Sequence, residues 1–196
     1  MPNAGRPRSE QSRCNILEAA LRLARTRGYA RLTIEEIAAE AGAGKQTIYR
    51  WWRSKAYVVL DALKENARVE IEVPDTGSLR QDIAGFLWNT FDAQRRRPGI
   101  TRVLQSMMAE AQLDAEFAES LRNGFIEPRR KTLKSLFTRA CARGEVGDLS
   151  DLNIWVDIAF GVLWYRILVD VGPLDKALAE KLADLLAAAA GAGRSA

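Results

Sequence analysis

The strongest constraint on the fold is a helical spacing of apolar residues that continues along almost the whole chain. Ile16, Ala20, Leu23 and Ala24 recur as they would on one face of an α-helix, and Gly28 ends the pattern. Alternating β-branched runs of useful length do not occur, so strands are not expected. The sequence therefore predicts an all-α fold of about nine helices.

The composition excludes most forms of catalysis by side chains. The 196 residues include no histidine and only two cysteines, which removes Ser-His and Cys-His nucleophile pairs and the usual zinc ligands. No carboxylates are placed with a nucleophile or a phosphate-binding loop. We therefore expect no enzyme, no metal and no cofactor.

The same composition bears on where the protein works. No run without a charged residue exceeds nine residues, whereas a membrane-spanning helix needs about 20 apolar residues. The basic N-terminus has no apolar stretch behind it, and two cysteines cannot build a disulfide framework. We expect a cytoplasmic protein that does not contact a membrane.

Positive charge is concentrated in the first quarter of the chain. Residues 1–55 carry eleven Lys and Arg against five Asp and Glu, a net +6, and the remainder carries 18 against 20, a net −2. This asymmetry favours a polyanionic partner, and an ordinary patchy surface is the alternative. Two later runs, Arg95-Arg96-Arg97 and Arg129-Arg130-Lys131, are interpreted as solvated helix ends, and a secondary DNA contact is the alternative.

Two short helices joined by a glycine turn are predicted between residues 33 and 52. Thr33 and Glu36 form a capping box, in which each side chain bonds an otherwise unpaired backbone amide. Gly42-Ala43-Gly44 permits a tight turn before a second helix from Lys45 to Trp52. Together with the basic helix before them, these elements predict a helix-turn-helix. Ser78 with Gln81 is a second capping box farther along.

Two stretches of this region resemble the DNA-binding domain of the TetR family of transcriptional regulators. They are Leu32-Thr33-Ile34-Glu35-Glu36-Ile37-Ala38-Ala39-Glu40-Ala41-Gly42 and Thr47-Ile48-Tyr49-Arg50-Trp51-Trp52-Arg53-Ser54-Lys55. The sequence departs from the family pattern at Gly44, where a serine cap is frequent, and at Arg53, where proline is common. Arg53 is expected to add a cation near the DNA phosphates.

The resemblance implies a set of DNA-binding residues. Lys45, Gln46 and Thr47 would read base edges. Tyr49 and Lys55 match phosphate contacts of the family, and the amide end of the helix capped by Thr33 would hold a phosphate. Arg50 is a further candidate. The alternatives are solvated surface charge for Lys45 and Arg50, and a core position for Tyr49.

The first nine residues are expected to be a flexible basic arm ahead of a DNA-binding domain at residues 10–70. Gly5-Arg6-Pro7-Arg8 resembles a hook for the minor groove, where Arg6 and Arg8 would meet a concentrated negative potential. An arm with only non-specific phosphate affinity is the alternative.

The remaining helices are expected to form a regulatory and dimerisation domain at residues 75–190, followed by a flexible tail at 191–196. Its short stretches Arg143-Gly144-Glu145-Val146, Tyr165-Arg166-Ile167-Leu168-Val169 and Gly172-Pro173-Leu174-Asp175 resemble a common type of TetR C-terminal domain. With that resemblance, some aromatic residues are expected to line a pocket for a small apolar effector, and plain core packing is the alternative. The predicted lining residues are Trp88, Phe91, Gln105, Phe117, Phe125 and Trp155.

A two-fold dimer interface is expected on the last two helices. Residues 151–171 are apolar on more faces than one small domain can cover, and Gly161 permits close helix approach. Packing within one chain is the alternative. The predicted interface residues are Trp155, Ile158, Val162, Leu178, Leu182 and Leu185.

These observations lead to a hypothesis of a cytoplasmic homodimeric repressor that binds a pseudo-palindromic operator in double-stranded DNA. A small effector would release it. One alternative is a nucleoid-type DNA binder without an effector. The other is a helical enzyme or ligand-binding protein with an incidental helix-turn-helix, which the lack of histidine disfavours. Specific binding to a palindrome at near-physiological salt separates these hypotheses.

Overall fold

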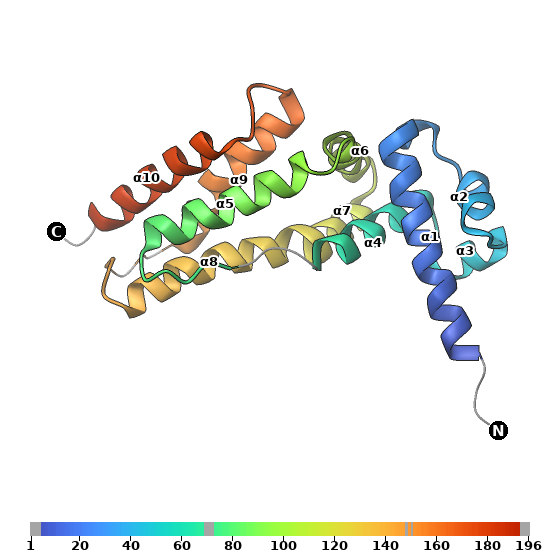
Figure 1. Cartoon of the computed structure of the whole chain (residues 1–196), viewed down its shortest axis with the longest axis horizontal. Helices are drawn as coiled ribbons and strands as arrows, with labels where there is room; N and C mark the ends of the chain where they lie inside the picture. Colours follow the sequence, from blue (N-terminus) through green and yellow to red (C-terminus); the bar gives the residue numbers. More distant parts are fainter. Residues whose placement is uncertain (1–4, 69–72, 148, 150, 193–196) are drawn as a thin grey trace. The chain divides into compact units, whose positions relative to one another are not determined.

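The computed structural model describes residues 5–68, 73–147, 149 and 151–192, without the side chains of residues 5–9, 67, 68 and 192. Within this part of the chain every regular element is a helix, which confirms the predicted all-α class (Figure 1). The α-helices are α1 (Gly5–Arg27), α2 (Ile34–Ala41), α3 (Lys45–Trp51), α4 (Lys55–Arg68), α5 (Leu79–Arg95), α6 (Ile100–Leu113), α7 (Ala115–Leu121), α8 (Glu127–Ala142), α9 (Leu152–Val169) and α10 (Lys176–Ala192).

Two shorter elements complete the described helices. A 3₁₀ helix, Tyr29–Arg31, follows α1, and a π-helical turn, Arg122–Ile126, joins α7 to α8 without a break. When α7, this turn and α8 are counted as one helix, the ten α-helices of the described chain become nine, as expected. Pro128 lies in the first turn of α8, directly after the π-helical turn.

The helices pack into two compact units. The first contains Met1–Val69 and Pro98–Phe125, and the second contains Glu70–Arg97 and Ile126–Ala196. In the first unit α6 and α7 contact each other and both contact α4, and α6 also contacts α1. Whether residues 10–70 and 75–190 are separate domains stays a prediction, because helical periodicity does not say which helices share a core.

α1 begins earlier than the sequence predicts. Residues 5–9 are helical, so the flexible arm expected at residues 1–9 is corrected for them, and residues 1–4 lie outside the described residues. Pro7 falls in the first turn of α1, where backbone amides have no partner within the helix, so its missing N–H costs nothing.

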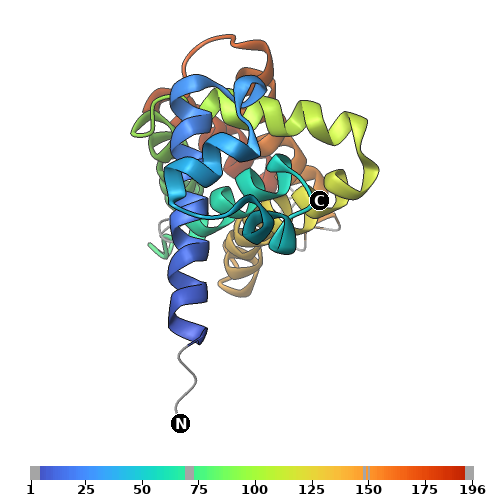
Figure 2. The ribbon, with the colours of Figure 1, turned by 90° about the vertical axis from the view of Figure 1, so that its right-hand side faces the viewer.

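The core of the first unit lies along α1. Ile16, Ala20 and Leu23 are buried there, as their spacing predicts. α1 packs against both α2 and α4, and α2 contacts α3, as Figures 1 and 2 show. The buried face of α1 therefore supports α2 directly and α3 through α2.

Gly99 brings the start of α6 against the end of α1. Its φ is +82°, and a Cβ added there would lie 2.4 Å from the carbonyl oxygen of Arg25. The Arg25 guanidinium in turn donates from Nε to the carbonyl oxygen of Pro98 at 3.0 Å. Glycine is required at this position for both the conformation and the close approach.

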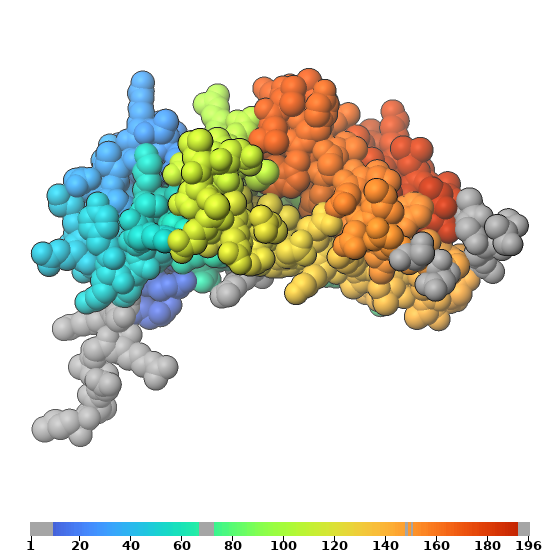
Figure 3. All heavy atoms as spheres, turned by 180° about the vertical axis from the view of Figure 1, so that it is seen from behind, coloured from blue at the N-terminus to red at the C-terminus, as the bar shows by residue number. Residues whose placement is uncertain are grey.

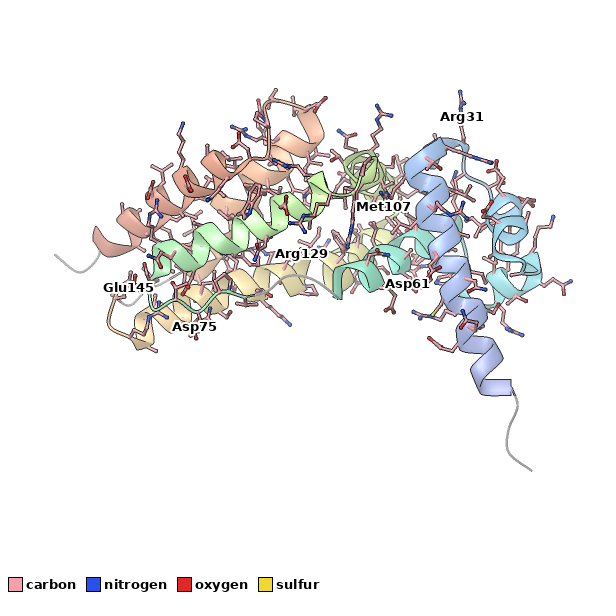
Figure 4. The ribbon with its side chains drawn as sticks, viewed as in Figure 1. Arg31, Asp61, Asp75, Met107, Arg129 and Glu145 are labelled. Atoms are coloured by element: carbon pink, nitrogen blue, oxygen red, sulfur yellow. The ribbon has the colours of Figure 1, made fainter. Side chains whose placement is uncertain are left out.

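The second unit is a layered packing of α5, α8, α9 and α10, in which α5 contacts both α8 and α10 and α8 contacts α9. Phe86 and Phe160 meet edge to face with ring centroids 6.5 Å apart. At one end, labelled by Asp75 and Glu145 in Figure 4, a polar cluster closes the unit. There Glu145 accepts a hydrogen bond from the backbone amide of Leu79 at 2.7 Å.

That contact corrects the capping box expected at Ser78 and Gln81. Ser78 is the N-cap of α5, but its hydroxyl makes no capping bond. The Glu145 carboxylate, from the loop after α8, takes this role instead. Nearby, the fully buried Asp82 carboxylate accepts hydrogen bonds from the amide and hydroxyl of Thr76 at 2.7 and 2.8 Å.

Among the described residues one helix, α9, is long and apolar enough to cross a membrane by length and composition alone. The core helix of a soluble protein passes the same test, so this is weak support for a span. α9 carries Asp157 and Arg166 within its length. Figure 3 shows α9 at the surface of the second unit, in orange.

Candidate nucleic-acid interface

The predicted helix-turn-helix is present with the expected caps. The Thr33 hydroxyl accepts a hydrogen bond from the Glu36 amide at 3.1 Å, and the Glu36 carboxylate accepts one from the Thr33 amide at 3.0 Å. Gly42 ends α2 in the left-handed conformation with φ 62°, which glycine adopts without strain. The capping box fixes where α2 begins, and Gly42 fixes where it ends and the chain turns toward α3.

The Glu36 carboxylate bears on the phosphate site expected at the start of α2. It accepts hydrogen bonds from both the amide and the hydroxyl of Thr33, so an anionic group already lies at this amide end. A phosphate would have to approach against that negative charge. The structure therefore gives Thr33 a structural role in α2, and its contact with DNA stays a prediction.

α3 separates buried from exposed residues along its short length. Ile48 is fully buried, as is most of Trp52 just after the helix, and Trp51 meets Trp52 edge to face at 5.4 Å. Tyr49 is 55% exposed, which disfavours the core alternative for this residue. Lys45, Gln46 and Arg50 are also exposed, and Thr47 is half-buried.

The first residue of α3 is held by α2. Lys45 Nζ donates to Glu35 Oε1 at 3.1 Å, and both side chains remain exposed. The pKa of Glu35 is lowered, first by a hydrogen bond from its own backbone amide and then by Lys45. On the same helix, the Arg50 guanidinium lies over the Trp51 ring at 5.4 Å. α3 thus presents two oriented cations beside an exposed amide and phenol.

The Lys55 side chain, a predicted phosphate contact, is bound within the protein. Its ammonium donates to the carbonyl oxygens of Tyr29, Ala30 and Leu32 at 3.1, 3.3 and 2.8 Å, and it lies 4.7 Å from the centre of the Tyr29 ring. An ammonium has three donors, so all of them are used within the protein. Lys55 therefore holds the 3₁₀ helix against α4, which its sequence position alone does not reveal, and its contact with a DNA phosphate stays a prediction.

Arg53, which is expected to add a cation near the phosphates, is bound within the protein in the DNA-free chain. Its guanidinium forms a two-pronged ion pair with the carboxylate of Glu116 and donates to the Tyr57 hydroxyl. Because Glu116 is distant in sequence, no motif indicates this contact. The side chains of Arg6 and Arg8 lie outside the described residues, so the minor-groove hook stays a prediction.

The six residues predicted to line one ligand pocket divide between the two units. Gln105, Phe117 and Phe125 belong to the first unit, where Phe117 is fully buried against Tyr57, with ring centroids 5.3 Å apart. The others belong to the second unit, which contains the fully buried Phe91 and the part-exposed Trp88 and Trp155. Trp155 packs on Phe137 with ring centroids 6.0 Å apart.

The two later charge runs are less solvated than expected. Arg130 forms ion pairs with Glu127 and Asp157 at 3.2 and 2.6 Å. Burial lowers the pKa of Arg129, labelled in Figure 4, to about 10. Arg96, at the C-terminal end of α5, pairs with Asp92 at 2.5 Å and remains exposed. The interpretation as solvated cations is thus wrong for Arg129 and Arg130, which contribute to packing in the second unit.

The predicted interface residues differ in their exposure within one chain. Ile158 is 45% exposed and Leu185 is 67% exposed, whereas Trp155, Val162 and Leu178 are part-exposed. Leu182 is only 5% exposed. Its placement at an interface is therefore corrected, because it faces the core of its own unit.

Two protein-family models match this chain. Residues 16–62 match the model of bacterial regulatory proteins of the tetR family, and residues 73–186 match the tetracyclin repressor-like C-terminal domain. The second match alone spans more than half of the chain. The chain belongs to the TetR family. It is therefore a DNA-binding transcriptional regulator with an N-terminal helix-turn-helix.

Relatives of known sequence support the same assignment over most of the chain. The TetR-family chain is 36% identical over 165 residues to the HTH-type transcriptional regulator YdeS of Bacillus subtilis, covering 84% of this chain and 82% of YdeS. It is 31% identical over 179 residues to the DNA-binding transcriptional repressor TetR of Mycobacteroides abscessus, covering 90% of this chain and 92% of the relative.

Solved structures of the TetR family share the fold. The TetR family transcription regulator SCO0332 superposes with a TM-score of 0.72 at 31% identity, covering 90% of this chain and 97% of that one. FadR from Bacillus subtilis, solved with stearoyl-CoA, gives a TM-score of 0.71 at 20% identity over 89% of this chain and 97% of FadR. At that identity FadR supports the fold alone.

Proposed function

We propose that this TetR-family regulator is a cytoplasmic repressor that binds a pseudo-palindromic operator as a homodimer and leaves it when a small effector binds. The observation that carries the DNA-binding part is the division of α3 into a buried and an exposed side. Ile48 and Trp52 anchor the helix, while Lys45, Gln46 and Tyr49 are exposed. The repressor TetR of Mycobacteroides abscessus, a relative over most of the chain, supports repression rather than activation.

The chemistry of the exposed residues suits base reading at the N-terminal end of α3. A lysine ammonium fits the O6 and N7 acceptors of guanine, and a glutamine amide fits the N6 and N7 edge of adenine. Lys45 and Gln46 are the first two residues of α3, and Thr47 follows them. Tyr49 and Arg50 lie farther along, where the backbone phosphates of a major groove would be in reach.

Dimerisation is proposed on one face of α9. Ile154, Ile158, Tyr165 and Leu168 are exposed apolar residues at helical spacing, and Gly161 lies on the same face with nothing within 4 Å of an added Cβ. A symmetry-related helix could approach closely there. Leu185, an exposed apolar residue on α10, is proposed as a further interface residue.

The effector is proposed to be small, largely apolar and neutral or weakly cationic. The second unit offers the part-exposed rings of Trp88 and Trp155, and aromatic side chains of this kind often line ligand pockets. An effector shifts the regulator only by its preference for one arrangement of the dimer. Changing occupancy from 99:1 to 1:99 requires about 5.5 kcal/mol of such preference.

Selection from a random pool of duplex DNA tests the first part of this proposal. The expected result is an enriched motif with two-fold symmetry, and an unsymmetrical or absent motif would contradict a dimeric operator-binding repressor.

A panel of apolar compounds, assayed for operator release and for thermal shift together, then tests the effector. Trp88→Ala should reduce release while operator affinity stays nearly constant. Specific operator binding that no compound weakens would favour a regulator without an effector.

A further inference from the structure

Arg53, two residues after α3, contacts side chains of two other helices. Two guanidinium nitrogens bind the two carboxylate oxygens of Glu116, and one also donates to the Tyr57 hydroxyl. The Arg53 guanidinium carbon lies 4.5 Å from the centre of the Tyr57 ring. The hydrogen bond from Arg53 to Glu116 is 2.6 Å long. Arg53 is thus tied to α4 and α7 at once.

The first turn of α7 holds Arg53 directly through Glu116 and indirectly through Phe117. Asp114 caps α7 by accepting hydrogen bonds from the amides of Glu116 and Phe117, both at 3.0 Å. Glu116 then contacts Arg53 directly. Phe117 acts indirectly, because its buried ring packs edge to face against Tyr57. The first turn of α7 therefore fixes both groups that surround the guanidinium.

The pair is well suited to exchange for a phosphate. Both side chains are more than half exposed, and an exposed ion pair contributes little net stability. A guanidinium fork fits a phosphate as well as it fits a carboxylate. It cannot bind both in this two-pronged way, because the same two nitrogens are needed. Arg53 lies two residues after α3, and the exposed Tyr49 and Arg50 of α3 are the proposed DNA contacts. A phosphate of the bound DNA could therefore come within reach of the Arg53 guanidinium.

We propose that Glu116 competes with the DNA backbone for the guanidinium of Arg53. Arg53 is then a phosphate contact whose availability is set by the first turn of α7. This inference rests on the proposed DNA binding by α3 and adds a regulated contact to that same surface. In the state described here, Glu116 holds Arg53 and lowers the affinity for DNA.

The test uses fluorescence anisotropy of the full chain with a mixed-sequence duplex, across a range of salt concentrations. Glu116→Gln removes the competing charge while keeping the side-chain shape, and it should tighten binding. The matched control is Glu119→Gln, an exposed residue on the same helix, which makes the same change in net charge. The gain from Glu116→Gln should exceed that from Glu119→Gln, and the excess should disappear when both proteins also carry Arg53→Gln.

The salt dependence gives a second readout. Each phosphate contact by a cation steepens the slope of log affinity against log salt by about 0.9. Adding Arg53→Gln to Glu116→Gln should therefore flatten that slope by about 0.9 for each lost contact. When the salt concentration is raised about fourfold, the affinity of the double variant should therefore fall about 3.5-fold less, for each lost contact, than the affinity of Glu116→Gln. Thermal unfolding of each variant verifies that the helices remain intact.

Three results would overturn the inference while leaving the proposed function in place. They are a gain for Glu116→Gln no larger than for Glu119→Gln, an excess that survives in the Arg53→Gln proteins, and an unchanged salt slope on removal of Arg53. A wild-type chain that binds no duplex DNA would contradict both this inference and the proposed function.

Discussion

Lys45 Nζ lies 3.1 Å from Glu35 Oε1, so the first residue of α3 is oriented by a carboxylate of α2. Glu35→Gln should release Lys45 and remove a negative charge from the proposed DNA surface. We expect higher affinity for mixed-sequence DNA and a specificity ratio lowered by about fivefold, because a less oriented lysine discriminates bases less well. Anisotropy with a selected operator and with mixed DNA measures both. Equal gains on the two DNAs would show that Glu35 acts by charge alone.

Lys55→Met should affect stability rather than DNA contacts. The substitution removes three hydrogen bonds to the carbonyls around the 3₁₀ helix. We expect a loss of about 1 kcal/mol in the free energy of unfolding, since the site is partly exposed to solvent. Urea titration measures this loss, and the salt slope of DNA binding should stay constant. A flatter slope at unchanged stability would restore Lys55 as a phosphate contact.

Gly99→Ala should destabilise the first unit. The added Cβ would lie 2.4 Å from the Arg25 carbonyl oxygen, and φ is +82°. We expect a cost of about 2 kcal/mol or more in the free energy of unfolding, combining backbone strain with steric conflict. Gly77→Ala is the matched control, because Gly77 has φ +83° but open space around its Cβ. Equal losses of stability for the two variants would show that the close approach of α6 to α1 contributes nothing.

Charge on the exposed face of α9 should prevent dimerisation. Ile158→Glu with Leu168→Glu places two carboxylates where a symmetry-related α9 is proposed to pack, and both residues are exposed in the single chain. Sedimentation velocity should then report monomers, with operator affinity strongly reduced. As a control, Glu180→Gln alters an α10 side chain of the same unit, and it should leave the dimer intact. Dimers that persist in the double variant would place the interface elsewhere.

Local signals in the sequence were sufficient for the recognition region. The capping box of Thr33 and Glu36 and the left-handed Gly42 depend only on residues a few positions away. Contacts between distant segments left no such signal. Arg53 binds Glu116, 63 residues later, and the Leu79 amide is capped by Glu145 rather than by Ser78.

The same limit explains the error at Leu182. Helical periodicity identifies the apolar residues of α10, but it does not say which of them face the core of the unit. Leu182 is buried within its own unit and Leu185 is exposed, although both fit an apolar pattern along α10. Only the packing of α10 against α5 separates the two.

The most direct test of the account is the affinity of the regulator for its selected operator relative to mixed-sequence duplex DNA, at near-physiological salt. A sequence-specific repressor should bind the operator about 10³-fold or more tightly than mixed DNA. Gln46→Ala should lower that ratio at particular base pairs by about 1–3 kcal/mol, without changing the salt slope. Equal affinity for operator and mixed DNA would contradict the account and indicate a non-specific DNA binder.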